Sequence, residues 1–131
     1  MARLILDTTI LIHLDRHRDR VLHISDADDI AIAAITLAEL QHGVLAADTA
    51  HRSAREQFVQ DIQDTIDVLP YTRSTAAEHA ALLDHVRRSG TPSGAHDLII
   101  AAHARQTGRH VATLEVAARF GGLPGVDIVD G

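Results

Sequence analysis

Five short apolar runs recur along the chain, and longer segments with helical character separate them. Each run is short enough for a strand, and an unbroken apolar run suits a strand that is buried on both faces. Strands that alternate with helices are typical of βαβ units. The sequence therefore predicts an α/β protein with a parallel sheet that helices cover on both faces. The five runs are residues 4–6, 30–35, 66–69, 110–112 and 126–129.

Helix signals fill the segments between these runs. Thr36 is expected to be an N-cap, because Glu39 follows it at the spacing of a capping box. The segment 51–66 has apolar residues on one helical face and charged residues on the other. Further helices are expected over 74–90 and 96–109, and the segment 89–95 is expected to be a loop.

Length and composition limit the possible classes of protein. A chain of 131 residues has the size of one domain, so we expect a single domain over residues 1–131. It contains no cysteine, which excludes disulfides and thiolate metal sites. The first residues reach a charge too early for a signal peptide, and no apolar run approaches the ~18 residues of a membrane span. We therefore expect a cytoplasmic protein with no membrane segment.

The net charge of −6 argues against a protein whose whole surface binds nucleic acid, because such binding rests on cationic side chains. Every cation is an arginine, however, and arginine is well suited to binding phosphate. Arginines on the rim of an acidic pocket could hold a polyanion, and the alternative is a solvated surface of mixed charge. The candidates are Arg16, Arg18, Arg20, Arg87 and Arg88.

Four acidic residues lie close to the ends of the expected strands. Asp7 follows the first strand, and Glu39 lies one helical turn beyond the second. Asp97 lies in the first turn of the last helix, and Glu115 follows the fourth strand. Ligand sites of parallel α/β sheets lie outside the carboxyl ends of the strands. The four carboxylates could therefore converge on one edge of the sheet.

A cluster of this kind needs a partner, because two like charges ~4 Å apart repel by about 4 kcal/mol at an effective dielectric of about 20. Oxygen-only sites are typical of Mg²⁺ or Mn²⁺, and such an ion can activate water for phosphodiester hydrolysis. Each acid also has a structural alternative. Asp7 could cap a helix that starts at Thr8, Glu39 could serve only its capping box, Asp97 could complement a helix N-terminus, and Glu115 could be a surface acid.

Four motifs in order resemble those of PIN-domain ribonucleases, and most closely the VapC toxins of toxin–antitoxin pairs. They are LDTTIL from Leu6, TLAELQHG from Thr36, GAHDLIIAAHA from Gly94 and ATLEVAARFGGLPGVDIVD from Ala112. The resemblance covers the chain nearly from end to end. It implies a three-layer α/β/α sandwich with a parallel sheet, and a homodimer. It also implies a metal-dependent endoribonuclease whose active site a VapB-type antitoxin occupies, often with a basic side chain.

The resemblance also assigns roles to individual residues. Asp7, Glu39 and Asp97 match the acidic triad that holds Mg²⁺ or Mn²⁺, and we expect Asp7 and Asp97 to be the direct ligands. Thr8 or Thr9 matches the hydroxyl residue after the first aspartate, and Thr113 matches the one that ends the fourth strand. Glu115 departs from the aspartate or asparagine that is more usual in the family. We therefore expect Glu115 to be catalytic without gripping the first ion directly.

The ten histidines raise the question of zinc or acid–base chemistry. His13, His96 and His103 lie near the acids in sequence, yet none forms a ligand pair of the HExxH type. His96 is expected to point to a different face from its neighbour Asp97. We interpret these residues as surface histidines or as histidines with satisfied hydrogen bonds, and His96 could contact RNA.

Two other classes of protein are alternatives to a nuclease. Phosphoacceptor receiver domains and haloacid-dehalogenase phosphatases also cluster acids and Mg²⁺ at strand ends, but both need a lysine, and this chain has none. The dehalogenase class also needs a DxD motif after the first strand. A PIN-like module that binds RNA or a partner without cutting remains the alternative, and the intact Asp7, Glu39 and Asp97 argue against it.

Overall fold

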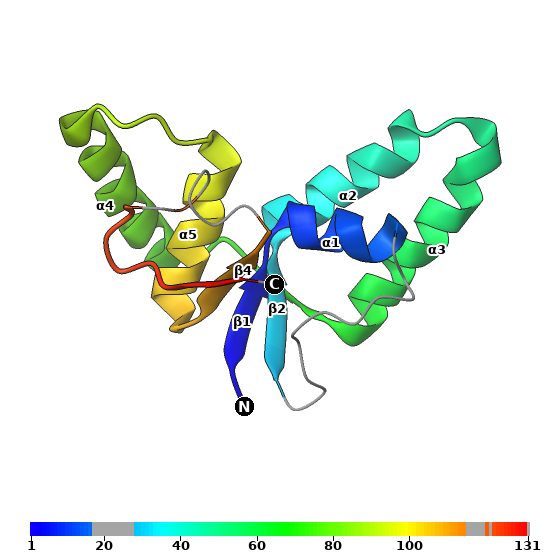
Figure 1. The fold of residues 1–131 in the computed structure, drawn as a ribbon, viewed down its shortest axis with the longest axis horizontal. Helices are drawn as coiled ribbons and strands as arrows, with labels where there is room; N and C mark the ends of the chain where they lie inside the picture. Colours follow the sequence, from blue (N-terminus) through cyan, green and yellow to red (C-terminus); the bar gives the residue numbers. More distant parts are fainter. Residues whose placement is uncertain (17–27, 115–119, 121, 131) are drawn as a thin grey trace.

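A computed structural model describes residues 1–16, 28–114, 120 and 122–130 of the chain. Strands and helices alternate through most of it, as the apolar runs predict, and Figure 1 shows their arrangement. The elements are β1 Arg3–Leu6, α1 Thr8–Arg16, β2 Asp29–Ala33, α2 Ala34–Ala46, α3 Thr49–Thr65, β3 Asp67–Leu69, α4 Arg73–Ser89, α5 Ala95–Thr107, β4 His110–Thr113 and β5 Ile128–Asp130.

The strands form one parallel sheet in the order β3-β2-β1-β4-β5, with β1 at its centre. Side chains of β1 alternate between two hydrophobic clusters, since successive residues of a strand face opposite ways. Leu4 and Leu6 pack on the side of α1, α2 and α3, whereas Ile5 packs on the side of α4 and α5. The predicted three-layer α/β/α sandwich with a parallel sheet is therefore confirmed.

Helix α5 lies between the sheet and α4, and it is the most buried helix in the described part of the chain. Its apolar run Leu98–Ala102 is buried except at Ile99, as the unbroken pattern of small and branched residues predicts. The helix ends at Gly108, and α4 ends at Gly90, both with a left-handed φ of 67° that glycine adopts readily. The predicted ends of both helices are therefore confirmed to within two residues.

Helix α2 begins three residues earlier than the capping-box pattern suggests. Its N-cap is Ala33, and Thr36 lies inside the first turn, where its side chain is buried. The expected strand over 30–35 accordingly ends at Ala33, because the chain passes from β2 directly into α2. Thr36 is therefore not an N-cap, and the box that caps α4 is formed instead by Thr72 and Thr75.

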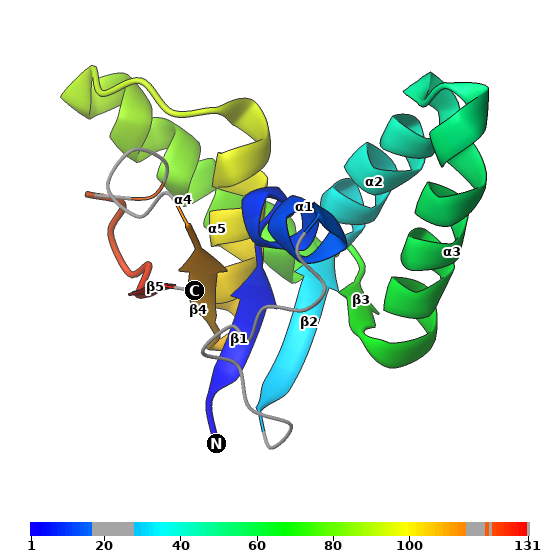
Figure 2. The ribbon, with the colours of Figure 1, turned by 45° about the vertical axis from the view of Figure 1, so that its right-hand side comes forward.

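The carboxyl ends of the strands all lie at one edge of the sheet, because the sheet is parallel. The first helix starts at Thr8, directly after β1, and α5 also begins at this edge. Above the edge, α2 and α3 rise on one side and α4 on the other, so that the two arms splay apart (Figure 2). In the described residues, no helix is long and apolar enough to span a membrane.

Candidate active site

Asp7 lies at the carboxyl end of the central strand and is completely buried. Its Oδ1 accepts hydrogen bonds from the Thr9 hydroxyl at 2.6 Å and from the Ile10 amide at 3.1 Å. Its Oδ2 accepts one from the Thr113 hydroxyl at 2.5 Å. The hydrogen bond from the Ile10 amide makes Asp7 a cap of α1. Asp7 therefore has the structural role that the sequence offers as an alternative, and this role is compatible with a chemical one.

These hydrogen bonds fix the orientation of the Asp7 carboxylate without neutralising it. The three donors are two hydroxyls and one amide, all of which are uncharged. A carboxylate offers about four lone-pair sites, so three bonds leave capacity for one more partner. Burying a carboxylate costs several kcal/mol, which neutral hydrogen bonds offset only in part. A cation at this edge would offset the rest.

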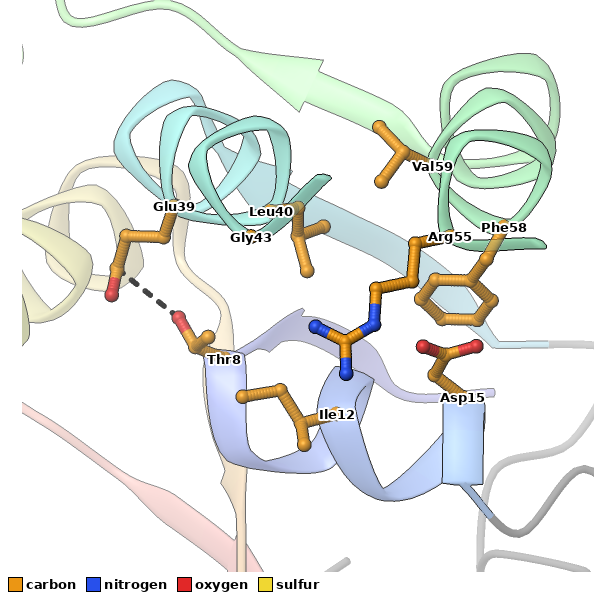
Figure 3. A pocket seen from close by; sticks show the side chains of 9 residues that line it. All are labelled: Thr8, Ile12, Asp15, Glu39, Leu40, Gly43, Arg55, Phe58 and Val59. Atoms are coloured by element: carbon orange, nitrogen blue, oxygen red, sulfur yellow. Dashed lines mark hydrogen bonds between the residues drawn. The ribbon is translucent and has the colours of Figure 1, made fainter. Parts of the chain in front are cut away.

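Glu39 reaches the same edge from α2. Its Oε1 accepts a hydrogen bond from the Thr8 hydroxyl at 3.2 Å, as Figure 3 shows. His96 Nδ1 lies 3.4 Å from the same oxygen, so His96 borders the acidic site. His96 is exposed whereas its neighbour Asp97 is buried, which agrees with the expectation that the two residues point to different faces of the helix. The first turn of α5 brings both His96 and Asp97 to one hollow beside Glu39.

Asp97 lies in the first turn of α5, where the helix dipole favours a negative charge. Only 7% of its surface is exposed. Gly94, the N-cap residue, leaves room for it, because a Cβ there would come within 2.8 Å of Asp97 Oδ2. The hollow at this point has a volume of about 260 Å³. Its lining residues are Glu39, Gly94, Ala95, His96 and Asp97.

The residues fit a hard divalent cation in chemistry, since carboxylate and hydroxyl oxygens are the donors that Mg²⁺ and Mn²⁺ prefer. The absence of a Cβ at Gly94 also leaves space for the carboxylate of Asp97. Within the described ranges, no group of three or more histidine, aspartate or glutamate side chains is arranged to hold an ion. Glu39 is instead engaged by Thr8 and His96.

Several predicted residues lie apart from this site or outside the described residues. Arg87 and Arg88 form exposed ion pairs with Asp84 on α4. Glu115, Arg18 and Arg20 lie outside the described residues, as does the side chain of Arg16. Their predicted roles remain untested.

One histidine differs from the interpretation given to it by sequence. His96 is exposed, as expected of a surface histidine, and lies beside Glu39. His103 on α5 is buried, and neither of its ring nitrogens has a hydrogen-bond partner among the described residues. Its ring meets that of Tyr71 edge to face, with 6.0 Å between centroids. Burial, and secondarily the charge of His79, lower the pKa of His103.

The parallel sheet and the acids at its carboxyl edge are the features expected of a PIN-domain protein, and comparison with known proteins agrees. The PIN-domain family profile matches residues 4–116. Ribonuclease VapC of Rickettsia bellii is 31% identical, over 77% of this chain and 76% of that protein. The tRNA(fMet)-specific endonuclease VapC of Salmonella typhimurium is 28% identical, over 99% of this chain and 98% of that protein.

Solved structures give the same result. DNA-bound VapBC from Salmonella typhimurium matches with a TM-score of 0.85 and 27% identity, over 99% of this chain and 98% of that one. The chain belongs to the PIN-domain family and, within it, to the VapC proteins.

Proposed function

We propose that this chain is an endoribonuclease that requires Mg²⁺ or Mn²⁺ and acts as the toxin of a toxin–antitoxin pair. Relatives that match most of the chain are named as VapC ribonucleases, and one is named as specific for tRNA(fMet). The proposed substrate is RNA, and the proposed regulator is a VapB-type antitoxin, since the similar solved structures include VapBC complexes.

One observation carries this proposal: the fully buried carboxylate of Asp7 at the carboxyl end of the central strand, which neutral donors hold in place. A purely structural cap could remain at the surface and avoid most of this desolvation. An acid buried where α/β proteins bind their ligands is explained if a cation completes it. RNA phosphates would then approach a locally neutralised edge, although the chain carries a net charge of −6.

Each residue of the proposed active site would have its own role. Asp7 and Asp97 would hold the ion, with Thr9 and Thr113 keeping the Asp7 carboxylate in one orientation. The ion would supply charge for the phosphate oxygens and activate water. Glu39 keeps one oxygen engaged by Thr8, and its side chain is 31% exposed, so it can accept a proton from the attacking water at the other oxygen.

Glu115 completes the proposed catalytic set, although it lies outside the described residues. Its extra methylene favours orienting water or a second, weaker ion. Residues 1–131 are proposed to form a single PIN domain that acts in the cytoplasm as a homodimer. An antitoxin would enter the acidic edge with a basic side chain, because opposite charges attract across an interface.

The test is RNA cleavage by the purified chain, freed of antitoxin, in EDTA, in Mg²⁺ and in Mn²⁺. Cleavage should require a divalent ion, and adding excess EDTA should stop it. Equal cleavage in EDTA would overturn the metal-dependent mechanism. Asp7→Asn, purified in the same way, is the control for contaminating nucleases. The purification should be repeated until the Asp7→Asn preparation shows no RNA cleavage.

A second candidate is a PIN-like module that binds RNA or protein without cutting. The observation in its favour is that no group of three or more histidine, aspartate or glutamate side chains within the described ranges is arranged to hold an ion. Glu39 also bonds with Thr8 and approaches His96. Such a module would bind RNA equally well with and without Mn²⁺ and would leave it intact. The cleavage assay and a binding assay together distinguish the two candidates.

A further inference from the structure

The first turn of α5 directs two neighbouring side chains to different places. Asp97 is buried, and its Oδ2 lies so close to Gly94 that a Cβ there would come within 2.8 Å. His96 is exposed, and its Nδ1 lies 3.4 Å from Glu39 Oε1. The proposed function gives Asp97 to the ion, whereas His96 has no role in it, although His96 contacts the proposed base.

The carboxylate of Glu39 is contacted at one of its two oxygens. Its Oε1 accepts the hydrogen bond from the Thr8 hydroxyl at 3.2 Å and also faces His96 Nδ1. Among the described residues, neither a hydrogen bond nor an ion pair reaches Oε2. Two contacts on one oxygen determine how the carboxylate is turned, and they leave the other oxygen for chemistry.

The two contacts come from two different elements. Thr8 is the first residue of α1, and its side chain is buried and β-branched, so it has few rotamers. His96 is the second residue of α5. Figure 3 shows the Glu39 carboxylate turned toward the Thr8 hydroxyl and away from Arg55. The carboxylate therefore bridges the first turns of α1 and α5, at the carboxyl edge of the sheet.

Neither contact is strong enough to hold Glu39 by itself. The 3.4 Å contact with His96 is longer than an ideal N–H···O hydrogen bond, and 3.2 Å is long for a bond between two oxygens. A glutamate side chain has several rotatable bonds, so fixing it costs conformational entropy. Loss of either contact should therefore let the carboxylate turn.

A released Glu39 would have another place to go. Glu39 and Asp97 line the same hollow of about 260 Å³. A hard divalent cation at Asp97 would attract a further carboxylate, because such ions are bound by oxygen ligands. A glutamate bound to the ion would be a poorer base, since a nearby positive charge stabilises its ionised form. The contacts at Oε1 oppose this movement.

We propose that His96 is a positioning residue for RNA cleavage: together with Thr8 it holds Oε1 of Glu39, which presents Oε2 to the attacking water and stays off the ion. The water oxygen bonds to phosphorus while its proton passes to Oε2. The bond from phosphorus to the leaving oxygen breaks, and that oxygen takes a proton from solvent. The inference rests on the proposed function and adds one residue to the same site.

Direct binding of RNA by His96 is the alternative role. The hollow that His96 lines also contains the carboxylates of Glu39 and Asp97, so charge gives no reason for a phosphate to bind there. The Nδ1 atom of His96 already faces Glu39. A contact that acts through Glu39 therefore agrees better with the geometry than a contact with RNA.

Calorimetric titration with Mn²⁺ and the kinetics of RNA cleavage in Mn²⁺ test the role of His96. His96→Leu removes both ring nitrogens and keeps a side chain of similar size. His96→Asn returns a donor to the place of Nδ1, because the nitrogen is bonded to Cγ in both side chains. His110→Leu, at an exposed histidine at the amino end of β4, is the control.

His96→Leu should bind Mn²⁺ roughly threefold to tenfold more tightly than the parent, because the released Glu39 adds a charged ligand. Its kcat should fall about tenfold at an unchanged KM for RNA, because the base is misplaced and RNA binding is not. His96→Asn and His110→Leu should match the parent in all three values. In a Glu39→Gln background, His96→Leu should leave the Mn²⁺ affinity unchanged, since the effect passes through the carboxylate.

Equal or weaker Mn²⁺ binding by His96→Leu would overturn the proposal, because a purely structural role at the start of α5 predicts that result. A raised KM at an unchanged kcat would also overturn it, in favour of direct RNA binding. If thermal melting shows that His96→Leu is unfolded, His96→Ala provides the same test with the best helix former. A parent that neither binds Mn²⁺ nor cleaves RNA would overturn the proposed function itself, and the role of His96 with it.

Discussion

The two ends of the central strand both hold buried charge, and they deal with it in opposite ways. At the amino end, Arg109 is buried and donates to the Leu4 carbonyl at 3.2 Å and to the Asp29 carboxylate at 3.1 Å. Arg3 lies 3.5 Å from the same carboxylate. At the carboxyl end, Asp7 is held by hydroxyls and an amide.

We interpret the amino end as serving stability and the carboxyl end as serving the proposed ligand. The hydrogen bond from Arg109 lowers the pKa of Asp29, so this pair is charged and neutralised within the chain at neutral pH. Since the folded-state pKa is lowered, its contribution to stability is present above the ordinary pKa and is lost as the pH falls below it. Neutral donors hold Asp7 in place, and in the proposed mechanism a cation balances its charge.

The largest effect should come from removing a charge at the carboxyl edge. Asp97→Asn should reduce RNA cleavage on the order of a hundredfold or more, because one ligand of the proposed ion loses its charge. Gel assays of cleavage in Mn²⁺ measure this, with Asp84→Asn on α4 as a control. A variant that cleaves normally would remove Asp97 from the catalytic set.

A change at the amino edge should affect stability and not cleavage. Arg109→Leu should lower the free energy of unfolding by roughly 2 to 3 kcal/mol, because it leaves the buried Leu4 carbonyl without its donor. Arg88→Leu, at an exposed ion pair, should change it by less than about 1 kcal/mol. Urea unfolding provides the values. If Arg109→Leu lost more cleavage activity than its unfolded fraction accounts for, this division of roles between the two ends of the strand would be wrong.

Removing the hydroxyl that orients Asp7 should have a smaller effect on the site. Thr113→Val keeps the shape of the side chain but removes the bond to Asp7 Oδ2. Affinity for Mn²⁺ should fall about tenfold, as is usual when a residue that supports a ligand is lost. Calorimetric titration measures it. Thr107→Val, which loses a hydroxyl bonded to the His103 carbonyl, should bind Mn²⁺ as the parent does.

The smallest effect concerns His103. It lies on α5, as Asp97 does, but it has no part in the proposed active site. Because burial lowers its folded-state pKa, the unfolded chain binds more protons just below the ordinary pKa of about 6.5. Stability should therefore be full above that pH and decline as the pH falls through the window below it. His103→Leu should remove this part of the decline.

Thermal melts of the parent and of His103→Leu between about pH 5 and about pH 7.5 measure the difference. His110→Leu, at an exposed histidine on β4, is the matched control and should keep the full pH dependence. If His103→Leu loses stability with pH as steeply as the parent, another histidine is responsible.

Much of the fold could be predicted from the sequence, because it depends on patterns that local physics sets. The alternation of apolar runs with capped helices predicts the parallel sheet, and Gly90 and Gly108 mark the ends of their helices. Thr36 shows the limit of such patterns. Its spacing to Glu39 matches a capping box, but β2 runs directly into α2 and takes the cap position upstream.

The chemistry of the site was predictable only in part. Acids that follow strands of a parallel sheet are expected at one edge, and the structure has Asp7, Glu39 and Asp97 in that region. The contacts of His96 with Glu39 and of Arg109 with Asp29 join residues that are 57 and 80 positions apart, so sequence spacing could not reveal them.

The central claim is that the carboxyl edge needs a cation, and metal-dependent melting tests it most directly. The parent should melt higher in Mn²⁺ than in EDTA, by about 2.7 kcal/mol equivalent when Mn²⁺ is present at about a hundred times its dissociation constant. Asp97→Asn should melt higher than the parent in EDTA, by ~1 to 2 kcal/mol equivalent, and should gain less from Mn²⁺. A parent that melts at the same temperature in EDTA and Mn²⁺, and above Asp97→Asn in both, would contradict the claim.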